Sequence, residues 1–492
     1  MNRLDRRSFL RRGALVAGSS VLVGPAFQAL ASRGALAAEG PLSRFASHAA
    51  GGYGPLMRKK PKAVDTEFPN AADIEWLALP EGFEYMVFGV AVDTMSDGNL
   101  TPIAHDGMAA FAAPGGKVRL VRNHENRDAG GVPIGGLTNA YDPNAAGGCT
   151  TLELDFAADD TPVLVQDFVS LNGTIVNCAG GLTPAGSWVS SEETTETRGG
   201  VKHGYNFEVP SAVGSAVAPV PLTAMGRFSH EAVAVDPVSG IVYQTEDAGD
   251  SGFFRFVPSN PANLAAAGVL EMLKVKGVNG ADLRTGQQIG RALPVEWVTI
   301  DDPDPAAGGL KDVYNQGFAK GGAVFRRLEG CWYGNGAISF NSTDGGDAGQ
   351  GQIWDYKPAG KSDGFLQLVY ESPGGAVLSF PDNIVVTPRG GLLLCEDHSF
   401  NRPTDPFAPL TNESGSAATR VHYLKGLTRD GRIFDFAAQL LDNREWAGAT
   451  FSPNGQYLFV NTQGTTSAFN PATPSHYGRT YAIWGPWASG AL

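Results

Sequence analysis

Cysteine is scarce in this chain, with four residues among 492, at Cys149, Cys178, Cys331 and Cys395. A small scaffold held together by disulfides is therefore excluded, because such scaffolds are short and dense in cysteine. An even count permits two disulfides in an oxidising compartment, although a core of this size needs no cross-links. We expect Cys149 and Cys331 to be core residues or a disulfide pair.

Positive charge is also in short supply, with 37 Lys and Arg against 50 Asp and Glu and a formal net charge of −13. Proteins that bind nucleic acid need a basic face, so this balance argues against nucleic acid as a partner. An acidic chain can instead direct its carboxylates at divalent cations, which prefer oxygen ligands.

The chain has no apolar run long enough to cross a bilayer, which takes roughly 20 residues. Its first residues place Arg6-Arg7 before a moderately apolar stretch, which ends at a cleavage site, Ala35-Leu36-Ala37. A short membrane anchor is disfavoured because the stretch is rich in Gly and Ser. The pattern predicts a twin-arginine signal at residues 1–37, recognised by the twin-arginine export machinery, and a periplasmic or secreted protein. Cleavage would remove six arginines and one aspartate, leaving a formal charge of −18 and no membrane span.

Helical periodicity is rare in this sequence. The best candidate is "PANLAAAGVLEMLKV", residues 261–275, which we expect to form one short helix at most. Elsewhere, 64 Gly and 32 Pro separate short apolar runs, a pattern typical of an all-β protein.

One theme recurs six times between about residue 115 and residue 463: a glycine turn, a short apolar strand, and a polar or acidic end. The six stretches are "GGKVRLVRNHE", "GSWVSSEE", "SGIVYQTED", "GCWYGNGAISFNSTD", "RGGLLLCEDH" and "NGQYLFVNTQ". Six such modules predict a six-bladed β-propeller, each blade being a small antiparallel sheet. We expect one propeller domain over residues 76–492, preceded by an extended N-terminal segment at residues 38–75.

Equivalent strands of a propeller end at the same height, so their acidic ends would form a ring of carboxylates in the central channel. The alternative is that these acids are ordinary turn residues, but five acidic ends among six favour the ring. Crowded like charges are costly unless a cation lies among them, and dense oxygen ligands suit Ca²⁺ or Mg²⁺. The sequence therefore predicts a metal site in the central channel.

The stretch "NCAGGLTPAGSWVSSEE" adds a thiol to this site. Cys178 lies in a glycine-rich turn, and the strand after it ends at Glu192 and Glu193. Carboxylates combined with a thiolate can hold a transition metal, although a disulfide is the alternative for this cysteine. Cys395 directly precedes Glu396, and neighbouring strand residues face opposite sides, so we expect Cys395 to be a core thiol.

Other carboxylates stand where the chain enters a strand and could reach the channel from there. They are Asp106 in "AHDGMAAF", Glu231 in "GRFSHEAVAVD" and Asp382 in "FPDNIVV", and each is also acceptable as a turn residue. The residues that we predict to bind metal are Cys178, Glu125, Glu192, Glu193, Glu231, Glu246, Asp382 and Glu396.

Several of these stretches also resemble a known family. "LPEGFEYMVFG", "MSDGNLTPIAHDGMAAF", "NCAGGLTPAGSWVSSEE", "GRFSHEAVAVDP" and "YQTEDAG" are similar to stretches of the PhoX-type alkaline phosphatases, in this order and over nearly the whole mature chain. The resemblance implies a six-bladed propeller, twin-arginine export, and hydrolysis of phosphate monoesters at an iron–calcium cluster. It further implies Fe³⁺ and Ca²⁺ as cofactors, Cys178 as an iron ligand, and Glu193 or Glu192 as the next acidic ligand.

For such an enzyme we expect small phosphorylated metabolites as substrates, a metal-bound water or hydroxide as the attacking group, and a monomer. Four side chains are candidates to bind the substrate phosphate because they can donate hydrogen bonds: Asn177, Arg122, His124 and Arg389.

Two other functions remain open. A calcium-dependent lactonase or ester hydrolase on a six-bladed propeller would need a single Ca²⁺ and no iron. A non-enzymatic envelope protein would use its metal for stability or to bind a ligand. Neither gives Cys178 a reason to face a metal, so the iron content of the protein separates them from a phosphatase.

Overall fold

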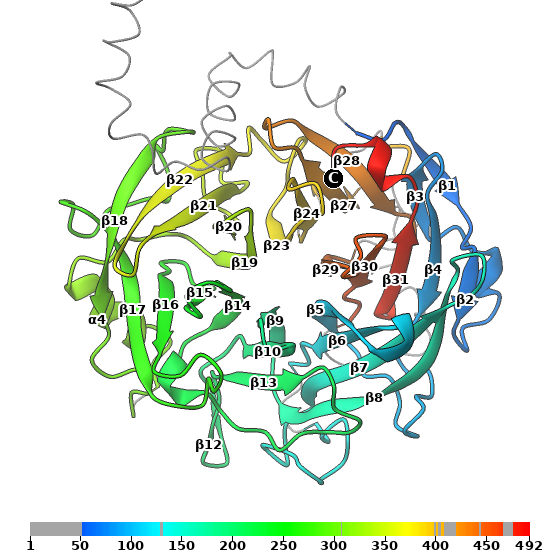
Figure 1. Ribbon diagram of the computed structural model, residues 1–492, viewed down its shortest axis with the longest axis horizontal. Coiled ribbons are helices and arrows are strands. Elements are labelled where there is room, and N and C mark those ends of the chain that lie inside the picture. Colours follow the sequence, from blue (N-terminus) through cyan, green and yellow to red (C-terminus); the bar gives the residue numbers. More distant parts are fainter. Residues whose placement is uncertain are drawn as a thin grey trace, which may run out of the picture.

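The computed structural model describes residues 52–127, 131–306, 308–397, 400–401, 405–407, 420–441, 444–465 and 476–492. Strands dominate this part of the chain, and Figure 1 shows them as sheets arranged around a common centre. The chain is therefore all-β with a propeller-like arrangement. The predicted signal at residues 1–37 lies outside the described residues.

Five larger sheets and two short hairpins contain the described strands. A four-stranded sheet has the order β5 (His105–Ala112), β6 (Val118–His124), β7 (Gly147–Phe156) and β8 (Pro162–Thr174). A three-stranded sheet contains β9 (Asn177–Leu182), β10 (Ser187–Glu192) and β13 (Asn206–Pro210), and the hairpin β11 (Thr197–Arg198) with β12 (Val201–Lys202) interrupts it in sequence.

The largest sheet has nine strands. Its first half has the order β14 (His230–Val235), β15 (Val242–Glu246), β16 (Phe253–Pro258), β17 (Gly268–Val275) and β18 (Ala292–Thr299). It continues through β22 (Asp363–Glu371), β21 (Gln352–Ala359), β20 (Ala337–Ser342) and β19 (Leu328–Gly334). Strand β18 thus pairs with β17 on one side and β22 on the other, and it joins the strands β14 to β17 to the strands β19 to β22.

The remaining sheets combine strands from both ends of the chain. One contains β1 (Leu56–Lys59), β3 (Leu77–Pro80), β28 (Ile433–Gln439), β27 (Tyr423–Leu427), β24 (Leu392–Glu396) and β23 (Pro381–Val386). The other contains β2 (Ala63–Asp65), β4 (Glu84–Phe88), β31 (Arg479–Trp484), β30 (Tyr457–Thr462) and β29 (Trp446–Phe451), and a short hairpin pairs β25 (Phe400–Asn401) with β26 (Arg420–Val421). Antiparallel pairing of β4 with β31 therefore closes the molecule.

The strands nearest the centre in Figure 1 are β5, β9, β14, β19, β23 and β29, and we call them the inner strands. Each contacts the next one around the centre, and β29 contacts β5, so the inner strands form a closed ring. Each inner strand pairs with a neighbour farther out, and we call these the second strands: β6, β10, β15, β20, β24 and β30. These are the strands that the recurring theme of the sequence predicted, the fourth stretch covering β19 as well as β20.

Helices are few in the described residues. They are α4 (Asp312–Ala319) and the 3-10 turns η2 (Ala71–Asp73), η3 (Pro114–Gly116), η4 (Thr223–Met225) and η6 (Trp487–Ser489). The short helix expected over residues 261–275 is wrong, because the second half of that stretch is strand β17. Strand β17 pairs with β16 on one side and β18 on the other, and this pairing outweighs the helical propensity of its Leu, Met and Lys residues.

The core lies between neighbouring sheets. One large group of buried side chains packs Trp76, Tyr85, Trp446 and Tyr481 between the two sheets that hold the chain ends. This packing and the pairing of β4 hold the inner strands in place from outside. No helix in the described part of the chain is long and apolar enough to cross a membrane.

Candidate metal centre

The inner strands begin with a repeated irregularity. In all six of them, the pairing register with the second strand shifts close to the first residue, which marks a β-bulge, and four of these bulges contain an acidic residue. A bulge re-aims the side chain that it contains. The acidic residues inside these four bulges are Asp106, Glu231, Glu329 and Asp382.

Backbone strain accompanies these turns into the ring. Two residues before four inward-facing side chains, a residue other than glycine has a positive φ, which costs about 1–3 kcal/mol and persists only where the surroundings impose it. These residues are Ala104 (φ 57°), Val176 (φ 51°), Arg327 (φ 42°) and Phe380 (φ 49°), which precede Asp106, Cys178, Glu329 and Asp382. The same local conformation thus brings carboxyl and thiol side chains from different strands to one end of the ring.

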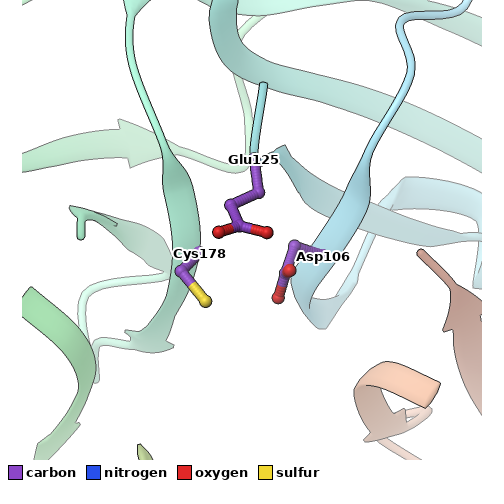
Figure 2. Close-up of side chains that lie close together, drawn as sticks. All are labelled: Asp106, Glu125 and Cys178. Carbon is purple, nitrogen blue, oxygen red and sulfur yellow. The ribbon is translucent and has the colours of Figure 1, made fainter. Parts of the chain in front are cut away.

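The side chains that arrive there form three overlapping groups that could hold metal ions. Within each group, one ligand atom from every member lies within 4.8 Å of the others. The groups are Asp106, Glu125 and Cys178; Cys178, Glu193 and Glu231; and Glu231, Glu329 and Asp382. Figure 2 shows the first group, with Asp106, Glu125 and Cys178 directed toward one another from three separate segments. We call these seven residues the acidic cluster.

Burial and mutual repulsion dominate the electrostatics of the acidic cluster. Burial and then the charges of Asp382 and Asp106 raise the pKa of Glu231 well above its ordinary value. Burial and the charge of Asp397 raise the pKa of Asp382 to about 7. Both carboxylate oxygens of Glu231 are buried and have no hydrogen-bond partner among the described residues. A buried carboxylate without partners is costly, and a cation would satisfy it.

Two arginines and one glutamine contact the acidic cluster. Arg127 forms ion pairs with Glu125 and Glu193, and its side chain is 47% exposed. Arg327 donates to Glu329 at 2.8 Å and pairs with Asp247 at 3.0 Å. Gln463 donates from Nε2 to both Asp106 and Glu125. The cluster therefore carries two guanidinium groups at its edge, each able to bind an anion.

Of the eight residues predicted to bind metal, five lie in the acidic cluster: Glu125, Cys178, Glu193, Glu231 and Asp382. The other three point away from it. Glu192 instead accepts hydrogen bonds from the backbone N–H groups of Ile175 (3.0 Å) and Gly204 (2.8 Å), and its Oε1 lies 2.7 Å from His203 Nδ1.

Glu246 and Glu396 have structural roles of the same kind. Glu246 accepts a hydrogen bond from Gly252 N at 2.8 Å. Glu396 accepts from Ser379 N at 2.9 Å and from Tyr423 N at 3.0 Å. The reason is strand alternation: in each acidic pair the first residue binds nearby backbone, and only the second faces the ring.

The four predicted phosphate-binding residues lie outside the acidic cluster. Arg122 is fully buried and donates to Gly89 O and to Thr480 Oγ1. Asn177 donates to Ser190 Oγ, and both ring nitrogens of His124 have hydrogen-bond partners at 2.9 Å. Arg389 lies in a separate surface cavity of about 490 Å³ and donates to Ala488 O. The structure therefore brings none of these four side chains into the acidic cluster.

Sequence reasoning missed three members of this site. They are Glu329, the second residue of β19, Arg327, which stands directly before β19, and Arg127, which lies beyond the end of β6. The fourth recurring stretch begins at Gly330, so the acidic residue directly before it, Glu329, lies outside the pattern. The signal was present, because Asp106, Glu231 and Asp382 also stand at the first or second residue of an inner strand.

All four cysteines are free thiols, so the predicted possibility of a disulfide between Cys149 and Cys331 is wrong. Cys149, Cys331 and Cys395 are buried in hydrophobic groups, as expected for core thiols. Cys178 alone among them joins carboxylates, and burial and then the charge of Asp106 raise the pKa of its thiol. A metal ion at this position would stabilise the thiolate.

Comparisons with known proteins identify the family of this chain. The family model described as alkaline phosphatase PhoX matches residues 57–465. The structure of PhoX from Pseudomonas fluorescens in complex with vanadate, a transition-state analogue, superposes with a TM-score of 0.59 at 16% identity, covering 85% of this chain and 97% of that one.

A gluconolactonase from Xanthomonas campestris matches with a TM-score of only 0.31 at 11% identity, over 78% of this chain and 97% of that chain, and carries no argument. A search of curated protein sequences found no significant match. The family match spans most of the chain and all seven residues of the acidic cluster. The chain therefore belongs to the alkaline phosphatase PhoX family.

Proposed function

We propose that this protein is an exported phosphatase that hydrolyses phosphate monoesters with Fe³⁺ and Ca²⁺ held in the acidic cluster. Family membership supports the activity. The observation that carries the metal proposal is Glu231, whose two carboxylate oxygens are buried without partners at the point where two of the three groups meet. Bound cations lower the cost of bringing so many buried carboxylates together.

The types of ligand fit the two metals differently. Cys178, Glu193 and Glu231 combine a thiolate with carboxylates, a set that suits a transition metal such as iron. Glu231, Glu329 and Asp382 offer only oxygen atoms, as Ca²⁺ prefers. Asp106 and Glu125 complete the site beside Cys178. When bound, the metals would supply Lewis acidity to the phosphoryl oxygens and to the attacking water.

Arg127 and Arg327 are the residues that we propose to bind the phosphoryl group. Their guanidinium groups stand on two sides of the acidic cluster and already contact carboxylates there. Guanidinium groups bind phosphate oxygens with paired, charge-assisted hydrogen bonds. We propose that the two arginines orient the phosphoryl group and balance the charge that it develops during transfer.

The setting of this enzyme follows from the sequence and from the ring of inner strands. We propose six blades around a central metal site, because six inner strands form a closed ring. We further propose a single domain over residues 76–492, a monomer, and small phosphorylated metabolites as substrates. Twin-arginine export to the periplasm or outside the cell suits a protein that takes up its metals while folding in the cytoplasm.

The test compares two variants, each of which replaces one cysteine. Cys178→Ala removes the thiol in the acidic cluster, and Cys331→Ala removes a buried thiol in the core. We expect Cys178→Ala to lose bound iron and at least 99% of p-nitrophenyl phosphate hydrolysis, on the order of the losses seen when a catalytic metal ligand or its support is removed. Cys331→Ala should retain both its iron and its activity.

Metal content and hydrolysis are measured on the same preparations, by elemental analysis and by release of p-nitrophenol. Wild-type activity in Cys178→Ala would refute the proposal. Calcium without iron in the wild-type protein, with no phosphatase activity, would instead favour a calcium-dependent lactonase or a binding protein.

A further inference from the structure

Three buried asparagines occupy equivalent places in the ring. Asn123, Asn341 and Asn461 lie in the second strands β6, β20 and β30 or at their ends, and all three are fully buried. Each directs its amide away from its own inner strand and toward the next inner strand around the ring. The three contacts therefore run in one direction between consecutive pairs of strands.

Each amide donates to the backbone carbonyl of a residue of the acidic cluster. Asn461 Nδ2 donates to Asp106 O at 2.6 Å. Asn123 Nδ2 donates to Cys178 O at 3.1 Å and to Ala179 O at 2.6 Å. Asn341 Nδ2 donates to Asp382 O. Each of these three cluster residues thus lies in one inner strand, while its backbone carbonyl accepts a hydrogen bond from an asparagine of the preceding pair of inner and second strands.

The bulges explain why these carbonyls are available. A bulged residue is left out of the ladder between its strands, and a buried carbonyl needs another partner. Asp106 and Asp382 lie in such bulges, so the bulge turns the side chain into the ring and leaves the carbonyl to the neighbouring asparagine. The bulge and the hydrogen bond from the asparagine therefore occur together.

We propose that Asn123, Asn341 and Asn461 are positioning residues that set the spacing of metal ligands across the gaps between sheets. Each bond joins two sheets that share no strand pairing: β6 and β9, β20 and β23, and β30 and β5. Metal sites tolerate little error in ligand position, and partners of the ligands typically contribute 10- to 100-fold in metal affinity.

Two of the asparagines are themselves held in place. Asn123 Oδ1 accepts hydrogen bonds from Cys149 Sγ, Trp188 Nε1 and Ser190 Oγ at 2.9–3.1 Å. Asn461 Oδ1 accepts from Thr480 Oγ1 at 2.7 Å. These donors fix which side of each amide faces the neighbouring carbonyl.

Close backbone contact makes the spacing rigid. A Cβ atom added at Gly107 would lie 2.5 Å from Ala179 Cα, and one added at Gly448 would lie 2.4 Å from Asp106 O. Both glycines stand beside the carbonyls that Asn123 and Asn461 hold. The inner strands therefore meet at van der Waals contact here, and a lost bond cannot be replaced by a small shift inward.

A control asparagine outside the acidic cluster also donates a hydrogen bond between two sheets. Asn335, in the β19–β20 turn, donates from Nδ2 to Gly390 O at 3.0 Å, which also joins two neighbouring sheets. This bond lies at the opposite end of β19 from Glu329, far from the acidic cluster along the strand. Asn335 is exposed, has a positive φ of 55° and accepts a hydrogen bond from Arg429, so Asn335→Leu removes an inter-sheet bond at a surface turn without touching a residue of the acidic cluster.

The experiment compares Asn123→Leu, Asn461→Leu and Asn335→Leu with wild type, using the full mature chain. Amide hydrogen exchange of the chelator-treated proteins reports on the strand entries, and calorimetric titration with Ca²⁺ reports the dissociation constant. We expect exchange at least about tenfold faster at residues 104–108 in Asn461→Leu and at residues 176–181 in Asn123→Leu. We expect Ca²⁺ dissociation constants raised at least about tenfold, and neither change in Asn335→Leu.

The metal half of this experiment rests on the proposed function, and the exchange half does not. If wild type binds no Ca²⁺, the proposed metal centre fails, and the exchange rates alone decide the role of the asparagines. Exchange and Ca²⁺ affinity within twofold of wild type in both variants would overturn the inference. If a leucine variant does not fold, Asn123→Asp and Asn461→Asp replace it, since they keep one acceptor oxygen and exchange the donating NH2 group for a second oxygen, which cannot donate to the neighbouring carbonyl when ionised.

Discussion

Glu231 is the residue whose surroundings most directly demand a cation. Its carboxylate is fully buried, both oxygens lack partners among the described residues, and other carboxylates raise its pKa. In the metal-free protein this side chain opposes folding, because a charged or protonated carboxyl must be buried beside like groups. In the loaded protein the same side chain would be a bridging ligand between two of the three groups.

We therefore predict opposite effects of Glu231→Gln on stability and on metal binding. The free energy of unfolding of the metal-free protein should rise by about 1–3 kcal/mol, because a neutral amide replaces a buried carboxyl. Bound metal and phosphatase activity should both be lost. Denaturant unfolding after chelation and elemental analysis check the two parts, and a destabilised metal-free variant would contradict the account.

Glu192 and Glu193 are neighbours with different tasks. Glu193 lies in the acidic cluster, whereas Glu192 accepts hydrogen bonds from Ile175 N and Gly204 N and contacts His203. Burial alone would lower the pKa of His203, but the hydrogen bond and charge of Glu192, together with Asp142, raise it. Glu192 thus ties the start of the Cys178 segment to the loop after β12.

Replacing each glutamate by glutamine should separate the two roles. Glu193→Gln should lose bound iron with little change in the stability of the metal-free protein. Glu192→Gln should retain the metal stoichiometry and lower the free energy of unfolding by about 1–3 kcal/mol, because a charged acceptor of several buried hydrogen bonds is weakened. Loss of iron from Glu192→Gln, together with full iron content in Glu193→Gln, would show that Glu192 and not Glu193 faces the ring.

At the scale of elements, the inner strand is the unit that builds the site. A left-handed residue, a ligand and a bulge follow one another at the start of β5, β19 and β23. The residue after the ligand then meets the next inner strand, and in two of these strands it is glycine: Gly107 and Gly330. Size at this position therefore controls how closely neighbouring ligands approach.

Gly107→Ala tests this packing. The new Cβ would stand 2.5 Å from Ala179 Cα and 2.9 Å from Cys178 O, both on the neighbouring inner strand. We expect a loss of about 1–3 kcal/mol in the free energy of unfolding, as for other overpacked cores, and weaker iron binding because Cys178 is pushed outward. Gly214→Ala is the control, because nothing lies within 4 Å of its Cβ position. Equal stability of the two variants would show that the strands yield easily.

The sequence predicted the second strands and most of the cluster for a physical reason. An apolar strand between a glycine turn and an acidic end is a local pattern that contains Glu125 and Glu193, and Glu231 and Asp382 stand where the chain enters a strand. Which member of an acidic pair faces the ring depends on bulges and register. Register is set by contacts between distant strands, so the sequence alone does not separate Glu192, Glu246 and Glu396 from the acidic residues that face the ring.

Non-local contacts also explain the other differences. Residues 268–275 have a composition compatible with a helix, and only pairing with β16 and β18 makes them a strand. Arg122 and His124 are polar residues of β6 whose partners lie on other segments, at Thr480 and Ile103. A single sequence gives no sign that such donors are already satisfied inside the fold.

At the scale of the whole molecule, the acidic cluster makes stability depend on pH and on metal. Burial and the charge of Asp397 raise the pKa of Asp382 to about 7, and burial raises the pKa of Glu246 to about 8, against about 4 in an unfolded chain. A raised carboxyl pKa contributes stability that is fully present below about pH 4. This contribution is lost as the pH rises through the folded-state pKa.

The melting temperature of the chelator-treated protein should therefore fall between pH 5 and pH 9. Added Ca²⁺ should restore the part due to the acidic cluster, because a bound cation favours its ionised form. The part due to Glu246 should remain, since Glu246 lies outside the three groups, and Glu246→Gln should remove it. Calorimetry at the two pH values checks each part, and a melting temperature that rises with pH would contradict this picture.

The central claim is that the acidic cluster holds iron and calcium and that these metals carry the phosphatase activity. The most direct measurement is elemental analysis of the exported mature protein, paired with p-nitrophenyl phosphate hydrolysis before and after chelation. The account predicts iron and calcium together, and activity that is lost to the chelator. Full activity in protein free of iron and calcium, or both metals bound without phosphatase activity, would contradict it.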